Sequence, residues 1–315
     1  MYEPTTWARQ TLDLSCQAHT KFQKDLYNKT MKIDLHIHTT FSDGGESIQK
    51  IFDIANKNGV KILSITDHTN IDAYNFFDAI DTHNIQVLRG MEVDVEFENL
   101  VVHILIYNFH LNDAIKNYLK AVRDFDIKEF RRMVNSCEKT KNVLFDKKIL
   151  ENFIKNNQYF DKVRLNNLLV QAGFATSPIE AFYSFTKEID DKKRYIVSAD
   201  EFFKIAKASN GQTFIAHPAK YLKDLKTMEN LEKYILKLKS LGLNGVEIYN
   251  NRQTLEQQSE LLTFSKNNNL KISGGSDYHA KYGGNEKKEI GKVLNFDIES
   301  DLVSHELFRD LNFSL

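Results

Sequence analysis

The stretch DLHIHTTFSDG, residues 34–44, sets the architecture of this 315-residue chain. His36 and His38 stand two positions apart at the end of an apolar run. Side chains at positions i and i+2 of a β-strand point to the same face, so both imidazoles can reach one metal ion. Asp43 lies beyond a bend and is free to reach a second ion. The stretch therefore predicts a strand end that carries one side of a metal site.

Strand and helix patterns alternate after this stretch. A short strand at 32–35 is followed by apolar residues at one-face helical spacing, namely Ile48, Ile51, Phe52 and Ala55. A buried strand pattern follows at 60–66, and such a strand–helix–strand unit implies parallel strands. Further strands are predicted at 85–91, 100–107, 213–216, 245–249 and 270–274, and helices at 72–81, 231–238 and 255–266. Seven strands with helices between them predict an α/β fold.

The strand pattern is interrupted between residues 112 and 209. This region is charged and mostly helix-patterned, and it lacks the Gly, Ser and Pro bias of a linker. We therefore predict an inserted helical cap. The predicted organisation is an N-terminal arm at 1–30, a main domain at 31–110 and 211–290, the cap at 111–210, and a C-terminal tail at 291–315.

Candidate ligands recur at the ends of the predicted strands. In α/β folds the carboxyl ends of parallel strands form one site, so ligands far apart in sequence are expected to meet there. All are nitrogen or oxygen donors suited to divalent metals, and their number exceeds what one tetrahedral ion can use. The set is His36, His38, Asp43, Asp67, His68, Glu92, His103, His217, Asp277 and His279.

Each of these residues taken singly has a simpler explanation. The His36–His38 pair could be a chance surface pair, and Asp67 could cap a helix. His103, inside a strand, could be a hydrogen-bonded core histidine. Independent explanations of this kind do not account for a ligand-type residue at the end of one predicted strand after another. The recurrence therefore favours two or three ions that share a bridging carboxylate.

Seven segments resemble the PHP (polymerase and histidinol phosphatase) superfamily of metal-dependent phosphoesterases. They read DLHIHTTFSDG, ITDH, RGMEVDVEF, VVHIL, FIAHP, GLNGVEIYN and GGSDYH, within residues 31–110 and 211–285. The resemblance implies a distorted (β/α)7 barrel and divalent ions of Mn, Zn or Fe. It also implies three metal positions: His36, His38, Glu92 and Asp277 for the first; Glu92, His103 and His217 for the second; and Asp43, His68 and His279 for the third.

The chain also resembles the TrpH/YciV-like branch of that superfamily, in which a helical cap is inserted before the His-Pro motif. Residues 163–174 look like a loose copy of the cap motif, with Arg164-Leu165-Asn166 where the branch usually has Arg-Pro-His. We interpret Arg164 as a candidate phosphate clamp, because a guanidinium matches phosphate in a bidentate way, and a solvated helix charge is the alternative. Asp67, the second candidate catalytic residue, could equally orient His68. Tyr249 and Asn250 are candidate pocket residues, whereas 192–194 are interpreted as a solvated basic loop.

The resemblance implies a metal-dependent phosphoesterase. Its branch acts on nucleotide 3′,5′-bisphosphates or on short RNA 5′ ends, and a metal-bridging hydroxide would attack phosphorus in line. One alternative is a histidinol-phosphate-type phosphatase, which the long cap and Asp43 oppose. Another is a metal-dependent C–N hydrolase, for which a carboxylated lysine at a strand end is missing. A binding module without catalysis is disfavoured by the intact ligand set.

Composition limits the partners. The net charge of −1 does not indicate a protein that coats nucleic acid, and no apolar run approaches the roughly 20 residues of a membrane span. We expect a phosphorylated small molecule or short oligonucleotide as substrate, with no stable duplex partner and no membrane. Cys16 and Cys137 stand far apart outside any redox motif, so a cytoplasmic location is expected.

Overall fold

Parallel strands near the N-terminus form the smaller of the two sheets that carry the site. The computed structural model describes residues 30–157, 159–190, 193–280, 288–294 and 296–308, so the predicted arm lies almost wholly outside the described residues. Strands β1 (Ile33–Ile37), β2 (Ile62–Ile65) and β3 (Gln86–Val87) pair in that order, all parallel. Helix α2 (Ile48–Lys57) connects β1 to β2 and buries the four apolar residues that have the predicted spacing. The predicted strand–helix–strand unit is confirmed.

The larger sheet has six strands of mixed direction, in the order β6-β4-β5-β7-β8-β9. Its strands are β4 (Gly90–Phe97), β5 (Leu100–Tyr107), β6 (Val197–Ser198), β7 (Gln212–Ile215), β8 (Gly245–Tyr249) and β9 (Lys271–Gly274). β4 and β5 form an antiparallel hairpin, and β5 also pairs antiparallel with β7. The sequence pattern did not predict this hairpin, because the acidic residues of β4 interrupt its apolar run.

The prediction of a seven-stranded barrel is wrong in one respect: the described residues form no closed barrel. Among the described residues, pairing between the two sheets is limited to isolated bridges, Ile37 to Tyr278 and His68 to Glu92. Continuous strand pairing is needed to close a barrel, and single bridges do not provide it. The structure is an α/β fold with one parallel sheet and one mixed sheet.

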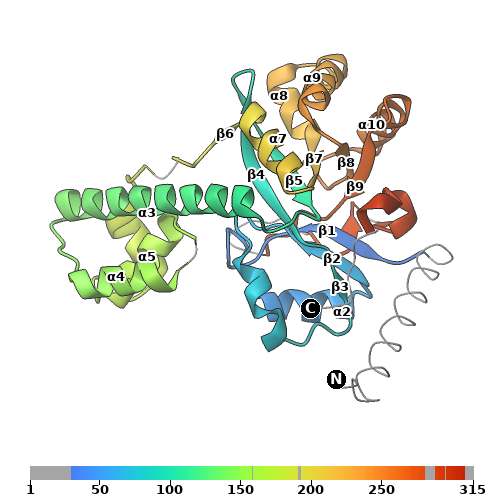
Figure 1. Ribbon diagram of the computed structural model, residues 1–315. Helices are drawn as coiled ribbons and strands as arrows, with labels where there is room; N and C mark the ends of the chain where they lie inside the picture. Colours follow the sequence, from blue (N-terminus) through green and yellow to red (C-terminus); the bar gives the residue numbers. More distant parts are fainter. Residues whose placement is uncertain (1–29, 158, 191–192, 281–287, 295, 309–315) are drawn as a thin grey trace, which may run out of the picture.

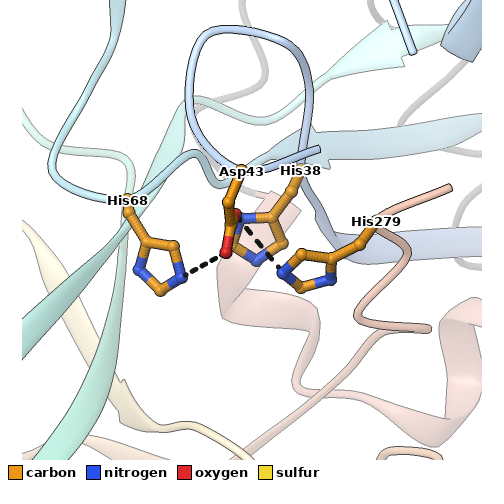
Figure 2. A group of neighbouring side chains, drawn as sticks. All are labelled: His38, Asp43, His68 and His279. Atoms are coloured by element: carbon orange, nitrogen blue, oxygen red, sulfur yellow. Dashed lines mark ion pairs between the residues drawn. The ribbon is translucent and has the colours of Figure 1, made fainter. Parts of the chain in front are cut away.

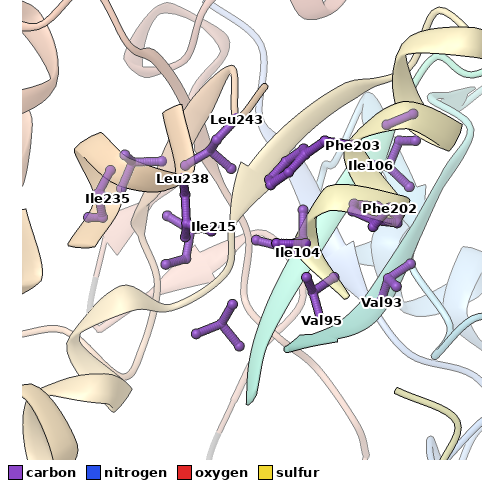
Figure 3. Packing of buried hydrophobic residues seen from close by; sticks show 14 of the residues in the cluster. Val93, Val95, Ile104, Ile106, Phe202, Phe203, Ile215, Ile235, Leu238 and Leu243 are labelled. Atoms are coloured by element: carbon purple, nitrogen blue, oxygen red, sulfur yellow. The ribbon is translucent and has the colours of Figure 1, made fainter. Parts of the chain in front are cut away.

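Helices cover the larger sheet and bury its apolar face. They are α7 (Ala199–Ala208), α8 (Leu222–Leu225), α9 (Met228–Leu241) and α10 (Leu255–Asn267), with the 3₁₀ turn η3 (Pro218–Tyr221) before α8. Figure 3 shows Phe202 and Phe203 of α7 beside Ile104 and Ile106 of β5, in the same core cluster. α7 falls within the range predicted for the cap, but its apolar side packs on the sheet.

The remaining helices of the predicted cap extend away from the sheets along one long helix. They are α3 (Asp113–Lys141), α4 (Lys147–Asn156), α5 (Lys162–Gln171), α6 (Pro178–Ala181) and the π-helix η2 (Phe182–Thr186). Figure 1 shows α3 projecting from the sheets, with α4 and α5 along its far half. The near half of α3 joins the sheet core through Val122, whereas Phe130 and Leu165 belong to a separate core.

The C-terminal segment that was predicted as a tail packs against the main core. It forms the short hairpin β10 (Lys292–Val293) and β11 (Phe296–Asp297), followed by η4 (Ser300–Leu302) and η5 (His305–Phe308). Val293 and Leu307 are fully buried. The predicted helix at 72–81 is the 3₁₀ helix η1 (Asp72–Ala79). No helix in the described part of the chain combines the length and the apolarity needed to cross a membrane.

Candidate metal centre

All nine predicted metal ligands lie together where the two sheets meet. His36 is in β1 and His38 follows it, Glu92 and His103 lie in the β4–β5 hairpin, and the others follow β1, β2, β7 or β9. These residues form four groups. Within each group every residue offers one ligand atom, and these atoms all lie within 4.8 Å of one another. The groups are His38, Asp43, His68 and His279; His36, His38 and Asp277; His36, Glu92 and His217; and His68, Glu92 and His103.

The first group surrounds Asp43 (Figure 2). The carboxylate Oδ1 lies 3.4 Å from His38 Nδ1 and 3.4 Å from His279 Nε2, and Oδ2 lies 3.6 Å from His68 Nε2. Three of its members, Asp43, His68 and His279, are those implied for the third metal position, and His38 joins them. His38 therefore lies between two groups, since His36 and Asp277 also approach it.

Glu92 connects the other groups. Its Oε1 lies 2.8 Å from His103 Nδ1 and 3.1 Å from His217 Nε2, whereas Oε2 lies 3.2 Å from His38 Nε2. Oε2 is also 3.4 Å from His36 Nε2. The two carboxylate oxygens thus face different histidines, which is the geometry that a bridging carboxylate requires.

The protonation states of several of these side chains favour metal binding. Burial opposes ionisation of Glu92, but the imidazoles of His103 and His36 hold its pKa well below the usual value. Burial lowers the pKa of His38 to about 3, and that of His217 to about 3. A neutral imidazole has a free lone pair and an ionised carboxylate is a ligand, so these groups are in ligand form at neutral pH.

The residues present fit a centre of divalent cations. His217 Nδ1 is buried and has no hydrogen-bond partner among the described residues, although a buried polar atom without a partner is costly. Burial disfavours the charged form of His36, but Glu247, Glu92 and Asp277 around it raise its pKa well above the usual value. Buried carboxylates that crowd one imidazole call for positive charge. A set of nitrogen and oxygen donors without sulfur suits Mn, Fe or Zn.

Glu247 is a positioning residue that sequence reasoning missed. Its Oε1 lies 2.8 Å from His36 Nδ1, and its Oε2 accepts hydrogen bonds from His217 N at 2.6 Å and Asn250 Nδ2 at 3.1 Å. A carboxylate behind a ligating histidine fixes the ring and its tautomer. The available signal was an acidic residue inside the otherwise apolar strand GVEIY.

Asp67 supports the loop after β1. Its fully buried carboxylate accepts hydrogen bonds from Thr39 N at 2.8 Å, Thr39 Oγ1 at 2.7 Å and Ser42 Oγ at 2.5 Å. Asp67 belongs to none of the four ligand groups. These contacts fix the loop that presents Asp43, and a catalytic role for Asp67 stays a prediction.

Arg164 holds the same loop from the cap. Its Nη2 donates to Thr40 O at 2.8 Å and to Ser42 O at 2.9 Å, and its guanidinium lies 5.2 Å from the ring centre of Tyr159. Arg164 thereby joins α5 to the metal-binding loop. Its predicted role as a substrate clamp is not tested by these contacts and stays a prediction.

Three cations that the sequence did not single out border the centre. Lys220 Nζ lies 3.1 Å from His103 Nε2. Arg252 Nε and Lys288 Nζ lie 3.2 and 3.0 Å from the same oxygen, Asp277 Oδ2. The other oxygen, Oδ1, faces His36 and His38 at 3.6 Å each. Asp277 therefore turns one oxygen to the ligand cluster and one to the cations.

A cavity of about 330 Å³ opens beside Asp43 and His68. Its wall holds Tyr159, Phe160 and Tyr195, the cations Lys193 and Arg194, and the acids Asp94, Asp126 and Asp161, together with Thr69 and Val122. The basic residues predicted to be a solvated loop are thus in part a cavity wall. Tyr249 and Asn250 line neither this cavity nor a neighbouring one that also touches His68.

An α/β fold with a buried cluster of metal-ligand side chains beside a cleft defines a metal-binding protein. The PHP domain profile matches residues 34–211, more than half of the sequence, and the chain belongs to the PHP domain family. The resemblance predicted from the motifs is confirmed.

Relatives of known activity extend this assignment. A 5′-3′ exoribonuclease of Haemophilus influenzae is 27% identical over 84% of this chain and 95% of its own length. A 3′,5′-nucleoside bisphosphate phosphatase of Chromobacterium violaceum is 25% identical over 79% of this chain and 87% of its own. The chain is therefore a metal-dependent phosphoesterase, a hydrolase of phosphate esters.

A solved structure shares the fold. A Bifidobacterium adolescentis protein assigned as a metal-dependent phosphoesterase superposes with a TM-score of 0.65. The match covers 89% of this chain and 95% of that one, at 22% identity. At this identity the likeness concerns the fold alone.

Proposed function

We propose that this phosphoesterase acts on 5′-phosphorylated nucleotides, either single or at the 5′ end of a short RNA. In both cases it would break the phosphate ester on the 3′ side of the first sugar. The observation that carries the proposal is the buried donor cluster beside a cavity whose wall holds three aromatic rings and two cations among its acids. Aromatic rings stack on bases and cations bind phosphate, so this wall suits a nucleotide.

The same chemical step would account for the activities of both relatives. A 5′-3′ exoribonuclease releases the first nucleotide by breaking the ester that follows it. A bisphosphate phosphatase that breaks the ester at the same 3′ oxygen leaves the same product, a nucleoside 5′-monophosphate. A single site in this chain would then accept both kinds of substrate, which differ only in what the 3′ phosphate carries.

We propose two or three divalent ions of manganese, zinc or iron as cofactors. His36, His38, Glu92 and Asp277 would hold the first, Glu92, His103 and His217 the second, and Asp43, His68 and His279 the third. Such ions, when bound, lower the pKa of water and neutralise charge on phosphoryl oxygens.

The side chains of the protein would bind and orient the ester. Lys220 offers a cation to a phosphoryl oxygen from its place beside His103. Asp67 and Arg164 would act as positioning residues through their hydrogen bonds to the loop of Asp43. In the hydrolysis a water oxygen bonds to phosphorus, the bond between phosphorus and the 3′ oxygen breaks, and that oxygen takes up a proton.

The same proposal includes a cytoplasmic location. Cys137 is a buried free thiol, and burial raises its pKa to about 11. A thiol of this kind is compatible with a reducing compartment.

The test measures metal content and then product release from a panel of phosphate esters. The panel contains a nucleoside 3′,5′-bisphosphate, a 5′-phosphorylated trinucleotide and histidinol phosphate. We expect two or three ions per chain, phosphate and nucleoside 5′-monophosphate from the first substrate, and nucleoside 5′-monophosphate from the second. The control is Glu92→Gln, which should lower both metal content and turnover.

Other outcomes would reject the proposal. Release of phosphate from histidinol phosphate alone would favour the alternative phosphatase. A fully metallated protein that cleaves none of the panel, but hydrolyses a C–N bond, would favour the other alternative.

A further inference from the structure

Two cavities share part of their lining beside His68 and differ in the residues beyond it. The second cavity, of about 310 Å³, shares His68, Thr69, Val122, Asp126 and Tyr159 with the first. Beyond these shared residues the first cavity continues to Lys193 and Arg194. The second continues to residues 70–72 and to residues 119, 120 and 123 of α3. The cleft is therefore forked, with the metal centre near the junction.

The first branch suits a nucleoside that carries a terminal phosphate. Three aromatic rings line it, from Tyr159, Phe160 and Tyr195. Arg194 is about half exposed, and Asp94, 3.5 Å from its Nη1, is its ion-pair partner in the described residues. A guanidinium with one long ion pair retains donors for a phosphate that carries two negative charges.

The second branch presents one guanidinium with an unused donor. Arg123 Nη2 donates to Ile154 O at 3.1 Å, and the guanidinium lies 5.1 Å from the ring centre of Phe160. Its Nη1 is buried and has no hydrogen-bond partner in the described part of the chain. The backbone carbonyl and the ring hold the side chain in place, and one of its N–H groups is left without an acceptor in a side chain that lines the cavity.

The charge of the second branch indicates which acceptor fits. Asp72 and Asp126 line it together with Arg123 and Lys120, and Lys120 is paired with Asp124 at 2.6 Å. The two acidic and two basic side chains of this lining nearly cancel in charge, so the branch offers an anion little beyond the one unused donor of Arg123. A phosphodiester carries a single charge and needs only the one donor.

We propose that the second branch binds the next phosphodiester of an oligonucleotide, through Arg123, while the first branch holds the 5′-terminal nucleotide. This inference rests on the proposed function and makes it more specific, because it assigns the substrate class that extends beyond one nucleotide. A 3′,5′-bisphosphate would fill the first branch and the metal centre only. A short 5′-phosphorylated RNA would fill both branches.

The test compares two substrates in three variants. The substrates are adenosine 3′,5′-bisphosphate and a 5′-phosphorylated tetranucleotide. We expect Arg123→Gln to lower the ratio of kcat/KM for the tetranucleotide to that for the bisphosphate about tenfold, because it removes one charged hydrogen bond. Arg194→Gln should lower kcat/KM for both substrates. The matched control is Arg131→Gln on the same helix; Arg131 is paired with Glu151, lines neither branch, and should leave the ratio as in the wild type.

Binding gives a readout that a merely structural role of Arg123 would not move. Fluorescence anisotropy with a phosphorothioate tetranucleotide measures affinity without hydrolysis, and thermal melting checks the fold. Loss of one phosphate contact should reduce the slope of log affinity against log salt by about 0.7 in Arg123→Gln. Arg123→Lys retains the charge and should restore the wild-type slope.

The outcomes separate the two proposals. If Arg123→Gln lowered kcat/KM equally for both substrates, or for neither, the proposal that Arg123 binds a second phosphate would be wrong. If the wild type hydrolyses neither substrate, the proposed function fails, and the salt dependence of tetranucleotide binding still decides whether Arg123 binds a second phosphate.

Discussion

Glu247 has a double contact that ties two ligands of the proposed metal centre together. One oxygen faces His36 Nδ1 and the other accepts from the backbone of His217. We predict that Glu247→Gln weakens metal binding about 10–100-fold, because the amide no longer fixes the ring of His36 as an anion does. Metal titration followed by calorimetry measures the change, and excess metal should restore much of the activity.

The control for this prediction is Glu256→Gln, at an exposed position in the first turn of α10. It should bind metal as the wild type does. Loss of activity in Glu247→Gln that excess metal does not relieve, with metal affinity unchanged, would contradict the positioning role.

Asp126 makes stability depend on pH. Burial raises its pKa to about 6, against the opposing charges of Arg123 and Arg194 and with the help of Asp94. The folded state therefore keeps a proton that the unfolded chain releases above its ordinary pKa of about 3.8, so this contribution to the unfolding free energy is lost as pH rises from about 4 to 6. We predict that Asp126→Asn is more stable than the wild type at pH 7.5, by at most about 3 kcal/mol.

Urea denaturation at pH 5.0 and pH 7.5 tests this expectation. The difference between Asp126→Asn and the wild type should be smaller at pH 5.0, where Asp126 is largely protonated in the folded state. A difference that is the same at both pH values would mean that Asp126 is ionised in the folded protein.

The residues of the site were predictable to different degrees. His36, His38 and Asp277 belong to a pattern that repeats at strand ends, and repetition is what separates a ligand from a chance histidine. Glu247 lies in an apolar strand and Lys220 follows a His-Pro turn, and neither belongs to a repeated pattern. In the sequence, an isolated charged residue looks the same whether its side chain orients a metal ligand or is solvated. Its partner is therefore known only from the fold.

At the scale of elements, the contact of α5 with the loop after β1 couples the cap to the metal centre. Arg164 uses one terminal nitrogen for two loop carbonyls. We predict that Arg164→Gln lowers kcat mainly by releasing the loop of Asp43, because the shorter, neutral amide removes the charged donor to both carbonyls. Steady-state kinetics at rising Mn²⁺ should show that activity recovers.

The same measurement separates this role from the predicted substrate clamp. Loss of a clamp would raise KM for the phosphate ester at every metal concentration. Lys162→Gln, two residues away on the same helix, is the control and should leave the dependence on Mn²⁺ as in the wild type.

Elements with a strong period were predicted well. The four apolar residues of α2 fall on one buried face, and β1 and β2 pair in parallel as expected. The β4–β5 hairpin was missed because the two strands of an antiparallel pair need no helix between them. Glu92 and Asp94 in β4 point toward the site, and their charge hides the strand pattern.

For the whole molecule, the donor cluster predicts strong coupling between metal and stability. Nine predicted ligands from both sheets meet at one place, and an ion that binds only the folded chain stabilises it. With free Mn²⁺ at about 100 times its dissociation constant, we expect about 2.7 kcal/mol and a Tm about 5 °C higher than with chelator. Differential scanning calorimetry measures the shift, and an unchanged Tm would contradict binding at the junction of the sheets.

Barrel closure was the part of the architecture that sequence could not decide. The number and order of strands follow from apolar patterns, but closure depends on the register between strands that are distant in sequence. Ile37 and Tyr278 meet in a single bridge, and nothing in either strand's composition distinguishes one bridge from a full ladder.

That bridge also has a kinetic consequence. It brings His38, near the beginning of the described chain, to His279, near its end, so the predicted ligand set is complete only after residue 279 has been synthesised. Contacts between such distant residues form late in folding, because the intervening chain must first be ordered. Metal uptake by the whole set would then come late in folding, and a nascent chain released before β9 would lack Asp277 and His279, two of the nine predicted ligands.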